Sequence, residues 1–240
     1  MLSGRIVIKR NGKDEAEKPF WISFADLMSA LMVLFLLVMS VALLAVTKTV
    51  SEAERAKLAR EQDIAALLQK LTQATAKHPG ISVDIDRHVI DFGDRARFET
   101  ASHKLSADQA RLLRAFVPEI LKIARDDLGQ KWLKRIVVEG FSDRRGTYLF
   151  NLNLSLQRSQ RVLCVLLAPP LSDEPAMTVD ELEQIRELFL VGGYSFNSAK
   201  ASFEESRRIE LRLEFLDMGE VRPSASGIAR GEFGSCALDR

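Results

Sequence analysis

The sequence predicts an α/β domain with a mixed sheet and helices, preceded by a single transmembrane helix and a helical linker. Residues 20–46 form an apolar stretch. At about 1.5 Å per residue, some 20 of these residues already span a hydrocarbon core of about 30 Å. Residues 47–77 are rich in Ala, Glu, Lys, Gln and Leu and contain neither Gly nor Pro, a composition typical of a helix. Beyond residue 81, strand-like and helix-like patterns alternate, which favours an α/β layer.

The apolar stretch contains one charged residue, Asp26. A carboxylate inside a membrane helix is costly and usually faces a partner or a water-filled path, so Asp26 is the candidate ion-translocating residue. The alternative is that Asp26 lies near the helix start and only reaches the headgroups. The stretch is longer than the apolar region of a signal peptide and therefore predicts an anchor. Five basic residues precede it, and they predict a cytoplasmic arm over residues 1–19 and an exported remainder: Arg5, Lys9, Arg10, Lys13 and Lys18.

The linker, residues 47–80, is predicted to continue the membrane helix until Pro79 and Gly80 end it. Near its end it carries an apolar stripe at helical spacing, made of Ile64, Leu67, Leu68 and Leu71. Upstream residues in line with this stripe are charged, so the pattern allows a dimeric coiled coil only near the end of the linker.

The domain is assigned to residues 81–216. Two short strands are expected around a turn at residues 86–88, because apolar residues alternate on both sides of it. Capping boxes at Ser106/Gln109 and Thr178/Glu181 predict two helix starts. The remaining expected elements are a helix ending near residue 127, a strand at 135–141, a loop at 142–146, a helix at 152–167, a helix at 178–188, and strands at 188–194 and 208–216. A Gly- and Ser-rich tail, expected to be loosely ordered, covers residues 217–240.

Composition argues against several function classes. A net charge of +1 gives no electrostatic basis for nucleic-acid binding. The three histidines, His78, His88 and His103, lack metal-ligand spacing, and the sequence contains no phosphate-binding, dinucleotide or nucleophile-elbow motif. No metal, cofactor or enzymatic activity is therefore expected. Cys164 and Cys236 either pair in an oxidising compartment, which would tie the tail to the domain, or are unrelated thiols with Cys164 as a buried apolar residue.

Residues 140–158 carry a pattern that resembles a known motif. The pattern resembles the peptidoglycan-binding motif of OmpA-like domains, G-x-[ST]-D-x-x-G-x4-N-x-x-L-S-x-x-R, in the residues Gly140, Ser142, Asp143, Gly146, Asn151, Leu154, Ser155 and Arg158. Phe141 departs from the family, which often has His or Tyr there. The resemblance implies an OmpA-like fold over residues 81–216 and binding of the bacterial cell wall.

The chemistry of these residues suits a peptide stem that carries diaminopimelate. Arg158 can hold a carboxylate in a bidentate fork, and Asp143 can pair with an ammonium group. Asn151 can bond ligand or backbone, while Phe150 and Leu154 can form an apolar wall. The structural alternative is that Asp143 only caps its loop and that Arg158 pairs with it internally.

The membrane segment adds a second resemblance. The start of MotB-type flagellar stator B subunits resembles this segment in the residues Trp21, Phe24-Ala25-Asp26-Leu27 and Met28. The sequence of residues 19–39 is most similar to that of the B subunits of Zorya anti-phage systems. This implies a single-pass bacterial inner-membrane protein with a periplasmic domain. The implied partners are a ring of MotA-like (ZorA-like) A subunits, a second copy in a homodimer, and peptidoglycan. The implied function is an ion-driven, stator-like defence subunit. A flagellar stator subunit and a static cell-wall anchor are the alternatives.

Overall fold

The computed structural model describes residues 14–170, 176–222 and 231–239, with side chains from residue 21 onward except at residue 22. Most of the predicted cytoplasmic arm, residues 1–13, lies outside the described residues. The chain divides into two compact units, residues 1–58 and residues 59–240. The last part of the predicted linker, from residue 59 onward, belongs to the second unit.

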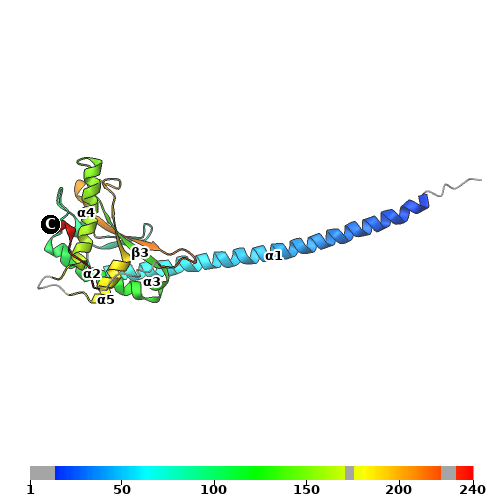
Figure 1. The fold of residues 1–240 in the computed structure, drawn as a ribbon, viewed down its shortest axis with the longest axis horizontal. Coiled ribbons are helices and arrows are strands. Elements are labelled where there is room, and N and C mark those ends of the chain that lie inside the picture. Colours follow the sequence, from blue (N-terminus) through cyan, green and yellow to red (C-terminus); the bar gives the residue numbers. More distant parts are fainter. Residues whose placement is uncertain (1–13, 171–175, 223–230, 240) are drawn as a thin grey trace, which may run out of the picture. The chain divides into compact units, whose positions relative to one another are not determined.

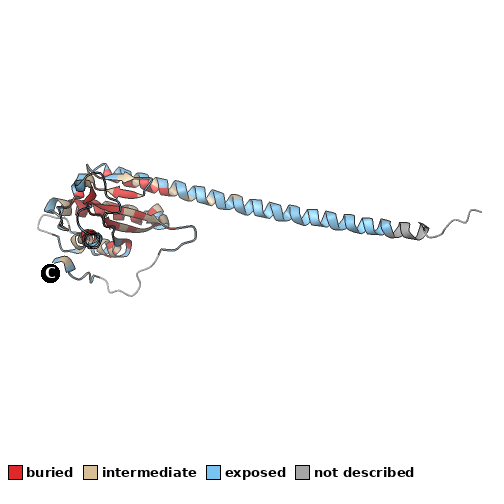
Figure 2. Ribbon diagram, turned by 90° about the horizontal axis from the view of Figure 1, so that it is seen from above, coloured by how far each residue is buried: buried red, intermediate tan, exposed pale blue. Residues whose placement is uncertain are grey.

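One helix, α1 (Asp14–Thr75), contains both the predicted membrane span and most of the predicted linker (Figure 1). Between residues 23 and 50, every side chain is exposed (Figure 2). The segment is long and apolar enough to cross a membrane. Ser29 and Ser40 donate their hydroxyl hydrogens to the carbonyl oxygens of Ala25 and Leu36, one turn earlier. Their polar groups are therefore satisfied within the helix, as a hydrocarbon environment requires.

The apolar stripe at the end of α1 belongs to the core of the second unit. Its four residues are 1–7% exposed and join one cluster with the sheet and α2: Ile64, Leu67, Leu68 and Leu71. The coiled coil that this stripe allowed is therefore excluded for these positions, because the same side chains already pack inside their own domain. Arg60 also donates two hydrogen bonds to the carbonyl oxygen of Leu216, which ties α1 to the end of the last strand.

A five-stranded mixed sheet forms the centre of the domain, in the order β1-β2-β5-β3-β4. Its strands are β1 (Ser82–Asp84), β2 (Val89–Asp91), β3 (Leu133–Gly140), β4 (Phe189–Gly193) and β5 (Ile209–Phe215). Among these five described strands, β3 and β4 are the one pair that runs parallel. Val138 on β3 lies opposite Leu211 on β5, and both are fully buried. The mixed sheet and the strands expected from alternation are confirmed.

The helices follow the predicted order, and two short helices, α3 and α6, are additional to the prediction. They are α2 (Ala107–Arg125), α3 (Asp127–Trp132), α4 (Tyr148–Leu167), α5 (Val179–Leu188) and α6 (Phe203–Ser206), with 3-10 turns at Gly93–Ala96 and Ala237–Asp239. Both predicted capping boxes are confirmed. Helix α4 begins four residues earlier than residue 152, because the Thr147 side chain accepts a hydrogen bond from the Phe150 amide.

Helix α4 packs directly on β3 and β4, and small residues make this approach feasible. A Cβ atom at Gly140 would lie 1.9 Å from the carbonyl oxygen of Ser155, so only glycine fits there. The hydroxyl of Ser155 accepts a 2.9 Å hydrogen bond from the amide of Ser195, in the loop after β4. Two motif residues, Gly140 and Ser155, thus place the start of α4 against the ends of two strands.

The described parts of the tail are attached to the domain. Arg222 donates hydrogen bonds to the carbonyl oxygens of Leu133 and Gly129. The amide of Gly231 donates to a carboxylate oxygen of Glu183. The expectation of a loosely ordered tail therefore does not hold for these residues.

Candidate functional site

A pocket of about 250 Å³ lies where the loop after β3 meets the start of α4 and the segment before α2. Ten residues line it: Thr100, Ala101, Ser142, Asp143, Arg145, Gly146, Phe150, Asn151, Leu154 and Arg158. All five predicted peptidoglycan-binding residues are among them. The structure thus brings the spaced motif together in a single cavity.

Arg158 forms the buried floor of this site. Its guanidinium donates hydrogen bonds to the carbonyl oxygens of Phe141 (2.7 Å), Ser102 (2.9 Å) and Glu99 (3.1 Å). These bonds use three of the five N–H donors of the guanidinium and leave two, on a side chain that is itself fully buried. Burial lowers the pKa of Arg158 to about 10, and the neighbouring charge of Arg207 acts in the same direction. Arg158 is therefore still a cation at neutral pH.

Asp143 caps its own loop by accepting a hydrogen bond from the Arg145 amide, as the structural alternative held, but its ion-pair partners are Arg145 and Arg207 and not Arg158. It receives the guanidinium of Arg145 at 2.6 Å and that of Arg207 at 3.2 Å. Burial by itself would raise the pKa of Asp143, but hydrogen bonds from the side chain and backbone of Arg145, and from Arg207, lower it to about 2. The carboxylate is thus charged throughout the physiological range.

The other three predicted residues divide between two roles. Asn151 is 2% exposed, and its amide donates to the carbonyl oxygens of Arg145 (2.7 Å) and Thr147 (3.2 Å). It therefore holds the 142–147 loop on the first turn of α4. Leu154 is 6% exposed and Phe150 is 51% exposed. The exposed ring of Phe150 offers an apolar surface at the mouth of the pocket.

Sequence reasoning missed several residues of this site. Arg145 stands within the motif at a position that the motif leaves open, and Thr100 and Ala101 come from a segment without a pattern. Ala101 has a positive φ of 54°, which is uncommon for a residue other than glycine. The Ser142 hydroxyl is buried and has no hydrogen-bond partner among the described residues. Of the lining residues that were not predicted to bind, only Ser142 and Gly146 could have been found from the sequence, because both are named positions of the motif.

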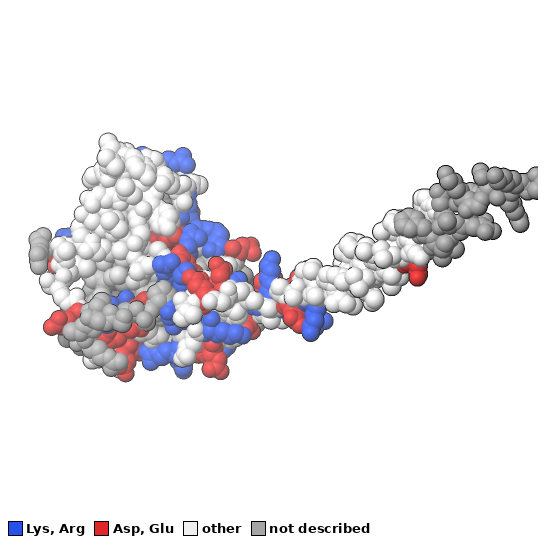
Figure 3. Space-filling view, turned by 45° about the vertical axis from the view of Figure 1, so that its right-hand side comes forward, with Lys and Arg blue, Asp and Glu red and all other residues white. Residues whose placement is uncertain are grey.

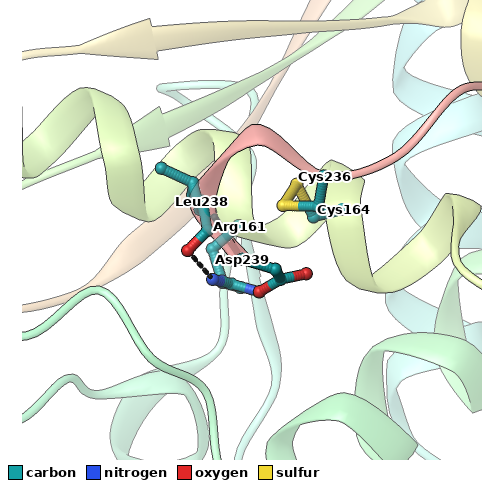
Figure 4. The surroundings of a disulfide bond; sticks show 5 residues. All are labelled: Arg161, Cys164, Cys236, Leu238 and Asp239. Atoms are coloured by element: carbon teal, nitrogen blue, oxygen red, sulfur yellow. Dashed lines mark hydrogen bonds and ion pairs between the residues drawn. A yellow bond between two sulfur atoms is a disulfide. The ribbon is translucent and has the colours of Figure 1, made fainter.

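Three sequence-predicted residues, Asp26, Cys164 and Cys236, are not among those that line this pocket. Asp26 is in the first unit, on the exposed surface of α1. Figure 3 shows a long uncharged stretch of this helix with an acidic group at one end. Cys164 and Cys236 form a disulfide with a Cα–Cα distance of 5.3 Å (Figure 4). Beside it, Arg161 on α4 forms an ion pair with Asp239 at 2.6 Å. Among the described residues there is no cluster that could hold a metal ion.

Comparison with known proteins identifies the family. A family model described as membrane MotB of the proton-channel complex MotA/MotB matches residues 8–55. The chain is 43% identical over 229 residues to the Zorya protein ZorB of Escherichia coli O139:H28 (strain E24377A / ETEC), an alignment that covers 95% of this chain and 93% of the relative. The chain belongs to the ZorB family. The resemblance of residues 19–39 to the B subunits of Zorya systems is therefore confirmed. Asp26 lies inside the segment of this chain that matches the MotB model.

Solved structures resemble the chain more distantly than its ZorB relative. The cell wall anchor of the T6SS from Pseudomonas aeruginosa is 22% identical, with coverage of 62% of this chain and 97% of that chain and a TM-score of 0.39. One structure of the periplasmic domain of Helicobacter pylori MotB is 18% identical, with coverage of 56% and 85% and a TM-score of 0.38.

Proposed function

We propose that this chain is the stator-like B subunit of an ion-driven, anti-phage membrane complex, with an ion-carrying end in the membrane and a wall-binding end in the periplasm. Membership of the ZorB family across 95% of the chain is the observation that carries this proposal. It favours a defence complex over a flagellar stator or a static anchor. The protein would transmit force by binding and would perform no covalent chemistry.

In the membrane, we assign ion translocation to Asp26. Protonation would remove its charge and lower the cost of facing lipid or a partner wall, whereas deprotonation would favour a different contact. Alternation between the two states could drive relative rotation inside a ring of MotA-like, here ZorA-like, A subunits. A second copy of α1 would pair with the first inside that ring. The match of residues 8–55 to the MotB model supports this assignment.

The orientation follows from charge and redox chemistry. The five basic residues before the span favour a cytoplasmic N-terminus. The disulfide between Cys164 and Cys236 supports an oxidising compartment for the domain. Both arguments support a periplasmic position for residues 59–240, on the side of the inner membrane where peptidoglycan lies.

At the wall-binding end, the pocket suits a stem residue with a carboxylate and an ammonium group. The two free donors of Arg158 would hold the carboxylate, and Asp143 would bind the ammonium. Phe150 and Leu154 would cover the aliphatic part of the ligand. Asn151 would keep the loop in place rather than touch the ligand, because its amide hydrogens are already bonded to the backbone.

Sedimentation with purified peptidoglycan sacculi tests the wall-binding half of this proposal. The full chain in detergent should pellet with sacculi, and Asp143→Asn and Arg158→Ala should each weaken binding at least tenfold, since one partner of a desolvated charge pair is worth about 2–5 kcal/mol. Asp108→Asn, an exposed carboxylate at the start of α2, is the matched control. Wild-type binding by a folded Asp143→Asn/Arg158→Ala double variant would refute the site.

A further inference from the structure

The carboxylate of Asp143 has no acceptor site left for a ligand. Its Oδ1 accepts hydrogen bonds from the amide (3.0 Å) and Nε (3.2 Å) of Arg145. Its Oδ2 accepts from Nη2 of Arg145 (2.6 Å) and from Nη1 of Arg207 (3.2 Å). Two carboxylate oxygens offer about four acceptor sites, and these four hydrogen bonds fill them. An ammonium group can reach Asp143 only after one arginine has left.

Arg207 is held too firmly to leave. Its side chain is 9% exposed, and it also donates to the carbonyl oxygen of Phe98 (2.8 Å) and to Glu204 (3.2 Å). Moving Arg207 away from Asp143 would break an ion pair of a buried cation and disturb these two further bonds, which is costly.

Arg145 is free to leave by comparison. Its side chain is 48% exposed and lies on the surface loop that lines the pocket. Its guanidinium makes two other contacts. One is a long hydrogen bond to the Thr100 hydroxyl (3.3 Å), and the other is a cation–π contact with the ring of Phe203, whose centre lies 4.6 Å away. Phe203 is itself 48% exposed. Water can replace these contacts at little cost, because exposed ion pairs contribute weakly to stability.

We propose that Arg145 is an internal counter-ion that occupies Asp143 in the free protein, and that the pocket takes a zwitterionic amino-acid end whose ammonium group displaces it. This inference rests on the proposed function, since it concerns the ligand class of the same pocket. Displacement makes Arg145 a specificity-determining residue. A dicarboxylate without an ammonium group gains nothing from moving Arg145 and competes only for Arg158.

Whether substitution of Arg145 tightens or weakens binding to sacculi distinguishes this role from direct contact with the ligand. If Arg145 competes with the ligand, Arg145→Ala should bind sacculi about two- to fivefold more tightly, the factor that corresponds to a half-exposed ion pair. If Arg145 instead held a ligand carboxylate, the same substitution would weaken binding. Arg144→Ala is the matched control, because it removes the same charge from the exposed neighbouring position.

The experiment measures sedimentation of the full chain in detergent with sacculi, with free meso-diaminopimelate or pimelate as competitor. We expect Arg145→Ala and Arg145→Gln to bind more tightly than Arg144→Ala, and meso-diaminopimelate to compete more strongly against them than against the wild type. Pimelate, which lacks ammonium groups, should show no such gain. In an Asp143→Asn background the gain should disappear.

Two different results would overturn two different statements. Binding by Arg145→Ala that equals or falls below that of Arg144→Ala, while Arg158→Ala still loses binding, would refute the role of Arg145 and keep the pocket. Wild-type protein that fails to pellet, or site variants that pellet normally, would refute the wall-binding half of the proposed function.

Discussion

Arg158 on α4 donates a 2.7 Å hydrogen bond from Nη1 to the carbonyl oxygen of Phe141, the residue that follows β3. Its other two bonds reach carbonyl oxygens in the segment before α2. One side chain thus joins three segments that are distant in sequence, and the space between them is the candidate pocket. Arg158 is therefore a structural residue as well as a proposed ligand-binding residue.

The double role of Arg158 predicts that charge alone cannot replace it. Arg158→Lys keeps the cation but loses the planar fork that reaches three carbonyl groups. We expect the free energy of unfolding to fall by about 2–4 kcal/mol and binding to sacculi to be lost. Denaturant titration of the full chain in detergent measures the first effect, with Arg144→Lys as control. A Lys variant of wild-type stability would contradict the three-carbonyl role.

The low pKa of Asp143 predicts a loss of stability in acid. Its folded-state value is about 2, below the unfolded value of 3.8. A depressed pKa contributes stability above the unfolded value, and here the contribution, about 2 kcal/mol, should be lost as the pH falls from about 4 to about 2. Asp143→Asn should lack this component of the pH dependence. Parallel acid unfolding curves for the two proteins would argue against the ion pairs with Arg145 and Arg207.

The contact between Gly140 and Ser155 predicts a strict requirement for glycine. Gly140→Ala places a Cβ atom 1.9 Å from a backbone oxygen that cannot move without shifting α4. We expect a loss of about 3 kcal/mol in stability or failure to fold. Gly192→Ala on the edge strand is the control, because its Cβ would meet side chains and no backbone atom: the Tyr194 ring at 3.1 Å and Val137 at 3.7 Å. Equal effects of the two substitutions on thermal unfolding would be inconsistent with this account.

The proposed role of Asp26 predicts that its titration, rather than its size, is required. Asp26→Asn should abolish protection against phage, since the side chain can no longer release a proton, while membrane insertion and assembly with the A subunit persist. Asp86→Asn, in the turn before β2, should keep full protection. Plaque assays and purification of the complex measure both outcomes. Full protection by the Asn variant would remove the ion-carrying role.

The disulfide predicts a tail that is covalently attached but independent of the pocket. The full chain, denatured without reductant, should expose no free thiol; two free thiols per chain would reject the bridge. Cys164→Ser/Cys236→Ser should speed proteolysis of the tail and leave binding to sacculi unchanged, because Cys164 is six residues after Arg158, at roughly 240° around α4. A marked loss of binding in this double variant would show coupling between tail and pocket.

Local patterns along the chain determined the membrane span, the strand and helix order, the two capping boxes and the identity of the motif. Each depends on residues within a few positions of one another: apolar length, alternation of two, and side chains that bond the next turn. The five site residues could be named because their spacing is itself a local pattern.

Tertiary structure decided what those residues touch. The stripe from Ile64 to Leu71 allowed a coiled coil, and only the packing against α2 and the sheet assigned it to the domain core. Asp143 could have paired with Arg158, yet the fold gives it Arg145 and Arg207, the second from 64 residues further along the chain. The physical reason is that an ion pair requires a distance of a few ångströms in space, and separation along the chain does not determine that distance once strands from different regions lie side by side.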